Sequence, residues 1–323
     1  MTLRWGILGL GKIANKFCKD LLLVEGNIIQ AVGSRTQAKA DEFAKTYSAK
    51  NVHGSYDALI ADPEVDIIYI ATPHNSHLEY ALRALNAGKH VLCEKPLAVN
   101  AMQVKQMVAC AQQNKRFLME ALWSRFNPSI REIKNKIDSG DIGEINYVNA
   151  DFTYNRNDSD ESRMLSSALA GGSLMDMGVY PVFLAYLIMG VPTKILASST
   201  LHTTGVDLQT AAVFQYPSGV AQIMSGFISE SDMVAKIYGT EGKIFIDRVW
   251  HEPDRYTIEQ KGKRTEFEQL RKGKGFTYEI EECFRCIQAG KLESDLWSHQ
   301  DSLNLITITD EIRRQSGVQY PFE

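Results

Sequence analysis

The chain has 323 residues, of which 44% are apolar and 23% charged, and its formal net charge is −4 at pH 7. This length predicts two domains rather than one core, and the mixed charges exclude the basic face that a nucleic-acid partner requires. No apolar run is expected to reach the length of a membrane span. The five cysteines are scattered and odd in number, which indicates a reducing compartment such as the cytoplasm.

The first predicted elements are an apolar strand over residues 4–8, a tight turn, and a helix from about residue 14. The turn has the pattern G-x-G-x-x-A. In this pattern the first glycine permits the turn, the second lets a pyrophosphate approach the backbone, and the small third residue lets the helix pack on the strand. The stretch therefore predicts a dinucleotide site at the helix N-terminus. Its candidate cofactor-binding residues are Gly9, Gly11, Lys12 and Ile13.

The end of the second predicted strand, residues 28–33, carries information about the cofactor. An acidic residue after it would bind the ribose 2′-hydroxyl of NAD, but the chain has Ser34 and Arg35 there. A hydroxyl and a guanidinium suit the 2′-phosphate of NADP, and the guanidinium can also stack on adenine. NADP is therefore favoured and NAD remains possible. The alternative for Arg35 is a solvated residue at the start of the next helix.

A nearly all-apolar strand over residues 65–71 fits a parallel sheet covered on both faces. The polar loop that follows is expected to contact the cofactor, and Ser76 is expected to cap the next helix. Two histidines three residues apart, at 74 and 77, invite a metal site, but no third ligand lies nearby and no metal is expected. The candidate cofactor-binding residues of this loop are Thr72, Pro73, Asn75 and His77.

A buried strand over residues 90–93 ends at Glu94, Lys95 and Pro96. Parallel sheets bind ligands at the carboxyl ends of their strands, so Lys95 is expected to aim its ammonium into a cleft, with Glu94 holding it. Glu94 and Lys95 are also candidate cofactor-binding residues. The alternative is that Glu94 and Lys95 are an ordinary pair of charged residues on the surface. Asn100 is expected to cap the next helix, and a strand over residues 117–122 completes a Rossmann-type, dinucleotide-binding domain over residues 1–122.

These motifs, Gly-Leu-Gly-Lys-Ile-Ala, Ala-Thr-Pro-His-Asn-Ser-His and Cys-Glu-Lys-Pro in that order, resemble the Gfo/Idh/MocA oxidoreductases. Further stretches at 119–126, 171–180 and 204–207 are similar to the branch that contains dimeric dihydrodiol dehydrogenase, NADP-dependent D-xylose dehydrogenase and glucose-fructose oxidoreductase. The resemblance covers essentially the whole chain. Members that oxidise inositols carry histidine where this chain has Tyr180, which counts against an inositol substrate.

Residues 123–323 are predicted to form an α+β domain that binds substrate and mediates dimerisation. From residue 194 onward six strands follow one another, with turn residues between them, which is typical of a large, mostly antiparallel sheet. Several strands have apolar residues on both faces, although an antiparallel sheet needs only one buried face. A covering partner is therefore expected, and the resemblance implies a homodimer packed sheet against sheet.

A helix through residues 177–189 carries Tyr180, four residues after Asp176, which places the two on one face. From spacing alone, the favoured interpretation is that Tyr180 is a half-buried core tyrosine whose hydroxyl is satisfied by Asp176. The resemblance instead implies that Tyr180 is the catalytic acid or base. Lys95 would then bind the same substrate oxygen and lower the pKa of the phenol, while Asp176 binds a substrate hydroxyl or orients Tyr180.

The substrate side is expected to be lined by Trp123, Arg125 and Phe126, together with Asp176 and Tyr180. The implied reaction is hydride transfer between a nicotinamide and a carbinol carbon of a sugar or vicinal diol. Two alternatives remain open: an NAD-dependent glycosidase of the same fold, and a non-catalytic dinucleotide-binding regulator. The C-x-x-C pair at 283 and 286 lies in a predicted amphipathic helix, and both cysteines are expected in the core.

Overall fold

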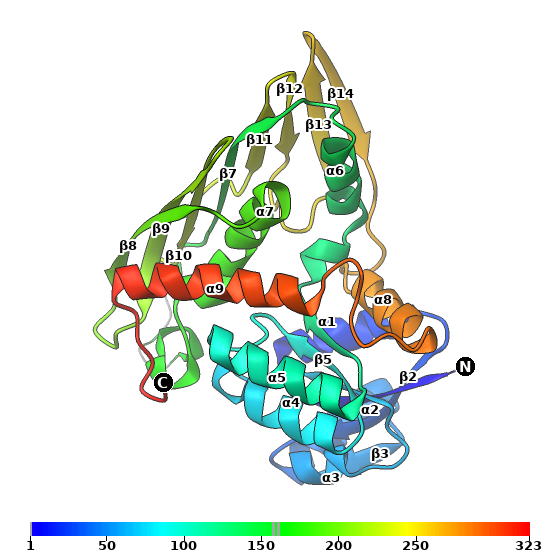
Figure 1. Cartoon of the computed structure of the whole chain (residues 1–323). Coiled ribbons are helices and arrows are strands. Elements are labelled where there is room, and N and C mark those ends of the chain that lie inside the picture. The colour runs from blue at the N-terminus through cyan, green and yellow to red at the C-terminus, as the bar shows by residue number, and fades with distance from the viewer. Residues whose placement is uncertain (1, 157–158, 160–161) are drawn as a thin grey trace. The chain divides into compact units, whose positions relative to one another are not determined.

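The computed structural model describes residues 2–156, 159 and 162–323. It divides into two compact units (Figure 1). The first comprises Met1–Phe126 and Lys272–Leu303, and the second Asn127–Arg271 and Asn304–Glu323. Division of the chain by sequence order at residue 122 therefore leaves out Lys272–Leu303, which returns to the first unit.

The first unit is built on a six-stranded sheet in the order β3-β2-β1-β4-β5-β6, and all neighbouring strands are parallel. The order reverses between β1 and β4, which is where dinucleotides bind in this architecture. The predicted Rossmann-type sheet is confirmed, with the short β3 as an additional strand. The strands are β1 (Leu3–Leu8), β2 (Asn27–Gly33), β3 (Asn51–His53), β4 (Ile67–Ile70), β5 (His90–Glu94) and β6 (Leu118–Ala121).

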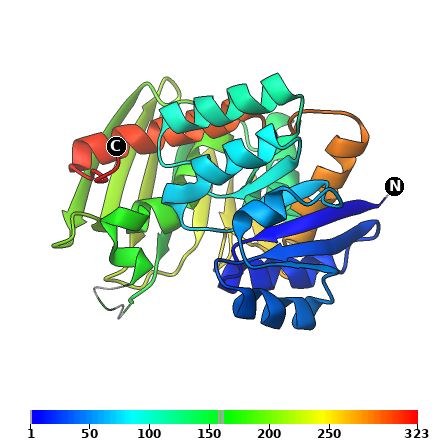
Figure 2. The ribbon, with the colours of Figure 1, turned by 90° about the horizontal axis from the view of Figure 1, so that it is seen from below.

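Helices connect these strands and cover the sheet, and α4 and α5 lie side by side (Figure 2). Because both faces are covered, the central strands are buried along their length, as their continuous apolar sequences predict. The helices are α1 (Lys12–Leu21), α2 (Gln37–Tyr47), α3 (Tyr56–Ile60), α4 (His77–Asn86) and α5 (Ala101–Asn114).

The returning segment Lys272–Leu303 contains α8 (Thr277–Gln288) and the start of α9 (His299–Ser316). It covers β6, the edge strand of the first sheet: the Leu118 amide donates to the Leu292 carbonyl at 3.0 Å, and His299 Nε2 lies 3.0 Å from the Leu118 carbonyl. An edge strand presents unpaired backbone groups, and these contacts satisfy two of them. The segment thus completes the first sheet.

The second unit contains an eight-stranded sheet in the order β14-β13-β12-β11-β7-β10-β9-β8. Only the pairing of β7 with β10 is parallel among the described strands, so the sheet is mostly antiparallel as predicted. Its strands are β7 (Ile145–Thr153), β8 (Lys194–Leu201), β9 (Asp207–Tyr216), β10 (Gly219–Gly226), β11 (Ala235–Gly239), β12 (Gly242–Ile246), β13 (Arg255–Gln260) and β14 (Lys263–Glu268).

One face of this sheet is packed against α7 (Val179–Met189), which contacts β7 and β10. Side chains alternate between the two faces: Val148 and Ala150 of β7 are buried, whereas Asn149 and Asp151 between and beside them are partly exposed. A second helix of this unit, α6 (Pro128–Asp138), begins with proline and is capped by the Asn127 side chain, which accepts from the Ser129 amide at 2.9 Å.

The helical run Ser167–Met189 is long and apolar enough to cross a membrane by length and composition, which corrects the expectation that no run reaches that size. In the structure, 78% of its apolar window is buried inside the protein. Its apolar character therefore corresponds to packing within the second unit.

Candidate active site

The turn after β1 has the shape that a pyrophosphate site requires. Gly9 has φ +94°, and a Cβ there would lie 2.7 Å from the Ala71 carbonyl oxygen, so only glycine fits. A Cβ on Gly11 would meet nothing within 4 Å, which leaves open space before α1. No side chain caps α1, and its first turn, from Lys12 through Ile13, carries no acidic residue. The helix start therefore fits a phosphate group.

Beyond β2, Ser34 is buried and its amide donates to the His53 carbonyl at 3.1 Å, whereas Arg35 is exposed. Burial raises the pKa of Tyr56 and of Tyr80, and the positive charge of Arg35 opposes that shift in both. The two tyrosine rings pack edge to face with centroids 5.0 Å apart. The charge of Arg35 thus reaches two packed aromatic rings. Such a setting suits an adenine and the 2′-phosphate of its ribose.

The loop after β4 contains the short 3₁₀ turn η1 (His74–Ser76), which includes Asn75 and follows Pro73. The Thr72 hydroxyl is buried and has no hydrogen-bond partner among the described residues. An unpaired buried hydroxyl is costly, and a cofactor hydroxyl would satisfy it. The loop therefore fits the predicted contact to the cofactor.

His77 joins this loop to the next one rather than facing outward. Its side chain has no exposed surface, Nδ1 lies 3.0 Å from the Pro96 carbonyl, and Nε2 lies 3.0 Å from the Thr72 carbonyl. Each ring nitrogen thus lies within hydrogen-bonding distance of a backbone carbonyl, one in each loop. His77 therefore joins the two loops, and its direct contact with the cofactor stays a prediction.

Lys95 lies directly after β5 and is half-buried, and the Lys95–Pro96 peptide bond is cis. Its neighbour Glu94 is buried and accepts a hydrogen bond from the Tyr69 hydroxyl. On the other side of the loop, the Leu97 amide donates to Glu120 Oε1 at 3.0 Å. Backbone and side-chain contacts therefore hold the loop that carries the lysine.

The predicted aromatic wall lies on the 3₁₀ turn η2 (Trp123–Phe126) of the first unit. Trp123 is buried and stacks on Phe276 of the returning segment, with ring centroids 4.9 Å apart. Phe126 is only 1% exposed, and Arg125 is half-buried. Phe126 is thus enclosed, as Trp123 and Tyr180 are, and its place on the substrate side stays a prediction.

Asp176 and Tyr180 lie in the second unit, but not on one continuous α-helix. Asp176 belongs to a π-helical turn, η5 (Leu174–Gly178), and Tyr180 to α7, which begins at Val179. Such turns are frequent at functional sites. Asp176 Oδ1 lies 3.0 Å from Arg163 Nη2, and this ion pair orients the carboxylate.

Tyr180 is 5% exposed and belongs to an aromatic cluster. Its ring centroid lies 5.5 Å from that of Phe152 and 5.2 Å from that of His251, and His251 stacks on Phe152 at 4.2 Å. This cluster fixes the orientation of the phenol ring. Sequence reasoning missed Arg163 and His251, because each is brought to the site only by the fold of the second unit.

Asp207 anchors the π-helical turn. It has no exposed surface, and its Oδ2 accepts from the Ser173 hydroxyl at 2.6 Å, the Leu174 amide at 2.8 Å and the Thr210 hydroxyl at 2.8 Å. Burial raises the pKa of Asp207, and these hydrogen bonds oppose the shift. The stretch 204–207 was noted in the sequence as part of the family resemblance. The sequence alone did not indicate which residues Asp207 would contact.

Cysteines 283 and 286 are both buried, as predicted for core residues. Within the described part of the chain, no group of three histidine, cysteine, aspartate or glutamate side chains has an arrangement that would hold a metal ion.

Comparison with protein-family models matches residues 3–122 to an oxidoreductase family with an NAD-binding Rossmann fold, and residues 130–245 to the GFO/IDH/MocA C-terminal domain. The two matches together span more than half of the chain. The chain belongs to the Gfo/Idh/MocA oxidoreductase family. The resemblance seen in its motifs is thereby confirmed.

Curated members of the Gfo/Idh/MocA family match the chain along nearly its full length. D-xylose 1-dehydrogenase (NADP⁺) of Hypocrea jecorina is 35% identical over 99% of this chain and 93% of its own. Trans-1,2-dihydrobenzene-1,2-diol dehydrogenase of Mus musculus is 36% identical over 99% of both chains. These relatives belong to the branch that the sequence motifs indicate.

Solved Gfo/Idh/MocA structures have the same fold. A 3-ketoreductase from Actinomadura kijaniata, in complex with NADP, superposes with a TM-score of 0.88 at 27% identity, covering 98% of both chains. Aldose-aldose oxidoreductase from Caulobacter crescentus, in complex with glycerol, has a TM-score of 0.89 at 25% identity, with the same coverage.

Proposed function

We propose that this protein is an NADP-dependent dehydrogenase that transfers hydride between the nicotinamide and a carbinol carbon of a sugar or vicinal diol. The observation that carries the proposal is the full-length similarity to curated enzymes whose names give those two substrate classes, one of them with NADP. The site agrees with it in detail, since the chain supplies a phosphate turn, a lysine after β5 and a buried tyrosine.

The cofactor would be held by three parts of the first unit. Gly9, Gly11, Lys12 and Ile13 would hold the pyrophosphate at the start of α1, where no side chain competes. Ser34 and Arg35 would bind the 2′-phosphate, because a guanidinium pairs with phosphate through two parallel hydrogen bonds. The buried Thr72 hydroxyl would bind the nicotinamide ribose. NADP, when bound, supplies the hydride acceptor.

Proton transfer falls to the chain's own residues. Tyr180 takes the proton from the carbinol hydroxyl during oxidation and returns it during reduction. An ordinary phenol, with a pKa near 10, is a poor base at neutral pH, so the ammonium of Lys95 is needed to favour the phenolate. Asp176, whose carboxylate Arg163 orients, binds a neighbouring substrate hydroxyl.

The test is to follow NADPH and NADH absorbance against a panel of aldoses, cyclic vicinal diols and dicarbonyls. We expect turnover of a sugar or diol, with NADP preferred about 10- to 100-fold, because hydrogen bonds to a charged phosphate contribute about 1.5–3 kcal/mol. Absence of turnover across the panel, or hydrolysis of a chromogenic glycoside without added cofactor, would contradict the proposal.

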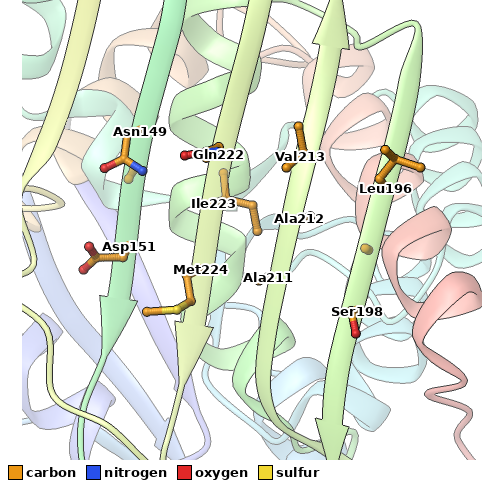
Figure 3. Close-up of a pocket in the computed structure, with 12 residues that line it drawn as sticks. Asn149, Asp151, Leu196, Ser198, Ala211, Ala212, Val213, Gln222, Ile223 and Met224 are labelled. Atoms are coloured by element: carbon orange, nitrogen blue, oxygen red, sulfur yellow. The ribbon is translucent and has the colours of Figure 1, made fainter.

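We also propose that the protein forms a homodimer through the second sheet. The face opposite α7 has a hollow of about 500 Å³ over β7, β8, β9 and β10, and the side chains of Leu196, Val213 and Met224 lie on this face (Figure 3). Leu196 is 51% exposed there, and Val213 and Met224 are partly exposed. An apolar face on an extended sheet favours a second copy of the same face.

A further inference from the structure

Glu120 is a buried carboxylate that the proposed reaction does not use. It is 2% exposed and lies on β6, whose register with β5 places it opposite Cys93. The loop carrying Lys95 begins at the end of β5. The carboxylate is therefore at the base of the lysine loop, on the strand next to β5 and opposite Cys93, which precedes Lys95 by two positions.

Three donors converge on this carboxylate. Oε1 accepts from the Leu97 amide at 3.0 Å, and Oε2 accepts from Trp297 Nε1 at 3.1 Å. The Ser302 hydroxyl donates the third hydrogen bond. Leu97 belongs to the lysine loop, whereas Trp297 and Ser302 belong to the returning segment. One side chain thus ties the loop to the segment that completes the first sheet.

Burial raises the pKa of Glu120, while the hydrogen bonds from Ser302, Trp297 and Leu97 and the positive charge of Lys95 oppose the shift. The groups that donate to the carboxylate therefore hold it in place, and one of them is the backbone of the lysine loop.

We propose that Glu120 is a positioning residue for Lys95, because it fixes the backbone of the loop from Cys93 to Leu97. Its catalytic consequence rests on the proposed function, whereas its effect on the lysine does not.

Other titratable groups also lie near the lysine loop. Glu94 accepts from the Tyr69 hydroxyl, and the His77 ring lies against the carbonyls of Pro96 and Thr72. Two side chains therefore contact the backbone of the loop, His77 at Pro96 and Glu120 at Leu97. The groups that face the loop from packed elements are Cys93 and Glu94 of β5, Tyr69 of β4, His77 of α4, Glu120 of β6 and Glu279 of α8.

The first test needs no substrate. The intact protein is labelled with an amine-reactive reagent, trinitrobenzenesulfonate, at one fixed pH, and the rate at Lys95 is read by peptide mass spectrometry. Glu120→Gln keeps one acceptor oxygen, so it can no longer accept from both the Leu97 amide and Trp297. We expect Lys95 to be labelled at least about threefold faster, because a loop that is held less firmly opens more often. An unchanged labelling rate would overturn the proposal.

The matched control is Glu282→Gln. Glu282 is also buried in the first unit and accepts hydrogen bonds from Arg285 and Ser294, away from Lys95. We expect this variant to leave the labelling rate of Lys95 unchanged. An equal change of the rate in both variants would show a general effect of removing a buried carboxylate and would overturn the proposal.

The second test uses catalysis. With the substrate found in the panel, Glu120→Gln should lower kcat about tenfold or more, because small displacements of a catalytic group are costly, while KM for NADPH stays unchanged. Equal losses in kcat and NADPH affinity would indicate a merely structural role. If the parent protein turns over no substrate, the proposed function fails, and the labelling comparison still decides the role of Glu120.

If Glu120→Gln does not fold, Trp297→Phe provides the second variant. It removes one donor to the same carboxylate and keeps an aromatic ring in the core. A labelling rate of Lys95 that differs from that of the parent supports the proposal, and an identical rate overturns it.

Discussion

Glu279 of α8 shows at the scale of one residue how burial controls protonation. Its side chain has no exposed surface, and neither carboxyl oxygen has a hydrogen-bond partner among the described residues. Burial raises the pKa of Glu279 well above its usual range, and the negative charges of Glu94 and Asp20 raise it further. The neutral acid is therefore the form that the folded protein accepts.

This makes stability depend on pH. Because the folded-state pKa is raised, the unfolded chain releases its proton first, near pH 4.5, and the folded protein loses stability as pH rises from there toward the folded-state pKa. Glu279→Gln, which cannot ionise, should therefore be more stable than the parent at pH 8, by about 1–3 kcal/mol. The gain should shrink toward pH 4.5, as measured by denaturant unfolding at several pH values.

Glu282 gives the opposite sign and serves as the control. Burial opposes its ionisation, but hydrogen bonds from Arg285 and Ser294 prevail and lower the pKa of Glu282. Glu282→Gln should therefore lose stability at pH 8 relative to the parent. A gain for Glu279→Gln that is the same at every pH would contradict the account of Glu279.

Residues whose chemistry is local were predictable from sequence. Gly9 has a positive φ in a turn, and Lys95 directly follows an apolar strand. Both features can be inferred from the residues next to them in the sequence. Glu120, Arg163 and His251 were not predictable, because their partners lie at least 13 positions away along the chain. Their importance depends on tertiary contacts.

At the scale of elements, apolar pattern predicted most strands and helices within a few residues, and β8 (Lys194–Leu201) was predicted with its observed bounds. The strands β3 and β14 were missed for a physical reason. Neither has a buried side chain, so neither has the apolar alternation by which strands are predicted. Pairing with β2 and β13 defines them.

Helix starts also differ in whether neighbouring residues or distant contacts determine them. Asn100 caps α5 as predicted, accepting from the Gln103 amide at 3.0 Å. Ser76 does not cap α4, because the preceding 3₁₀ turn directs its hydroxyl to the Pro73 carbonyl at 2.8 Å. The π-helical turn before α7 was also missed, since it depends on Asp207 of a distant strand.

At the scale of the whole molecule, the return of Lys272–Leu303 to the first unit was not predictable from chain order. It depends on contacts across most of the sequence: Asp20 of α1 accepts from the amides of Lys274 and Phe276. The sheet topologies of both units were predictable, because alternating and consecutive strands leave different patterns in the chain.

The homodimer is the prediction that belongs to this scale. Leu196→Asp places a charge in the exposed apolar face of the second sheet, where burial against a partner would leave it unpaired. We expect the parent to have about twice the chain mass of 36.2 kDa, and the variant to have the mass of one chain, as measured by light scattering after size-exclusion chromatography.

Leu270→Asp is the matched control, because Leu270 is 76% exposed and lies outside the four strands of that face. It should leave the mass at that of the parent. A parent that is monomeric, or a Leu196→Asp variant that keeps the mass of the parent, would contradict the proposed interface.

The central claim is that Lys95 assists proton transfer by Tyr180 and that the cofactor still binds when Lys95 is replaced. The most direct measurement is kcat of Lys95→Met, with NADPH affinity determined separately by fluorescence titration. The account predicts that kcat falls at least about 100-fold while Kd for NADPH stays within about threefold of the parent. Turnover by Lys95→Met near the parental rate would contradict it.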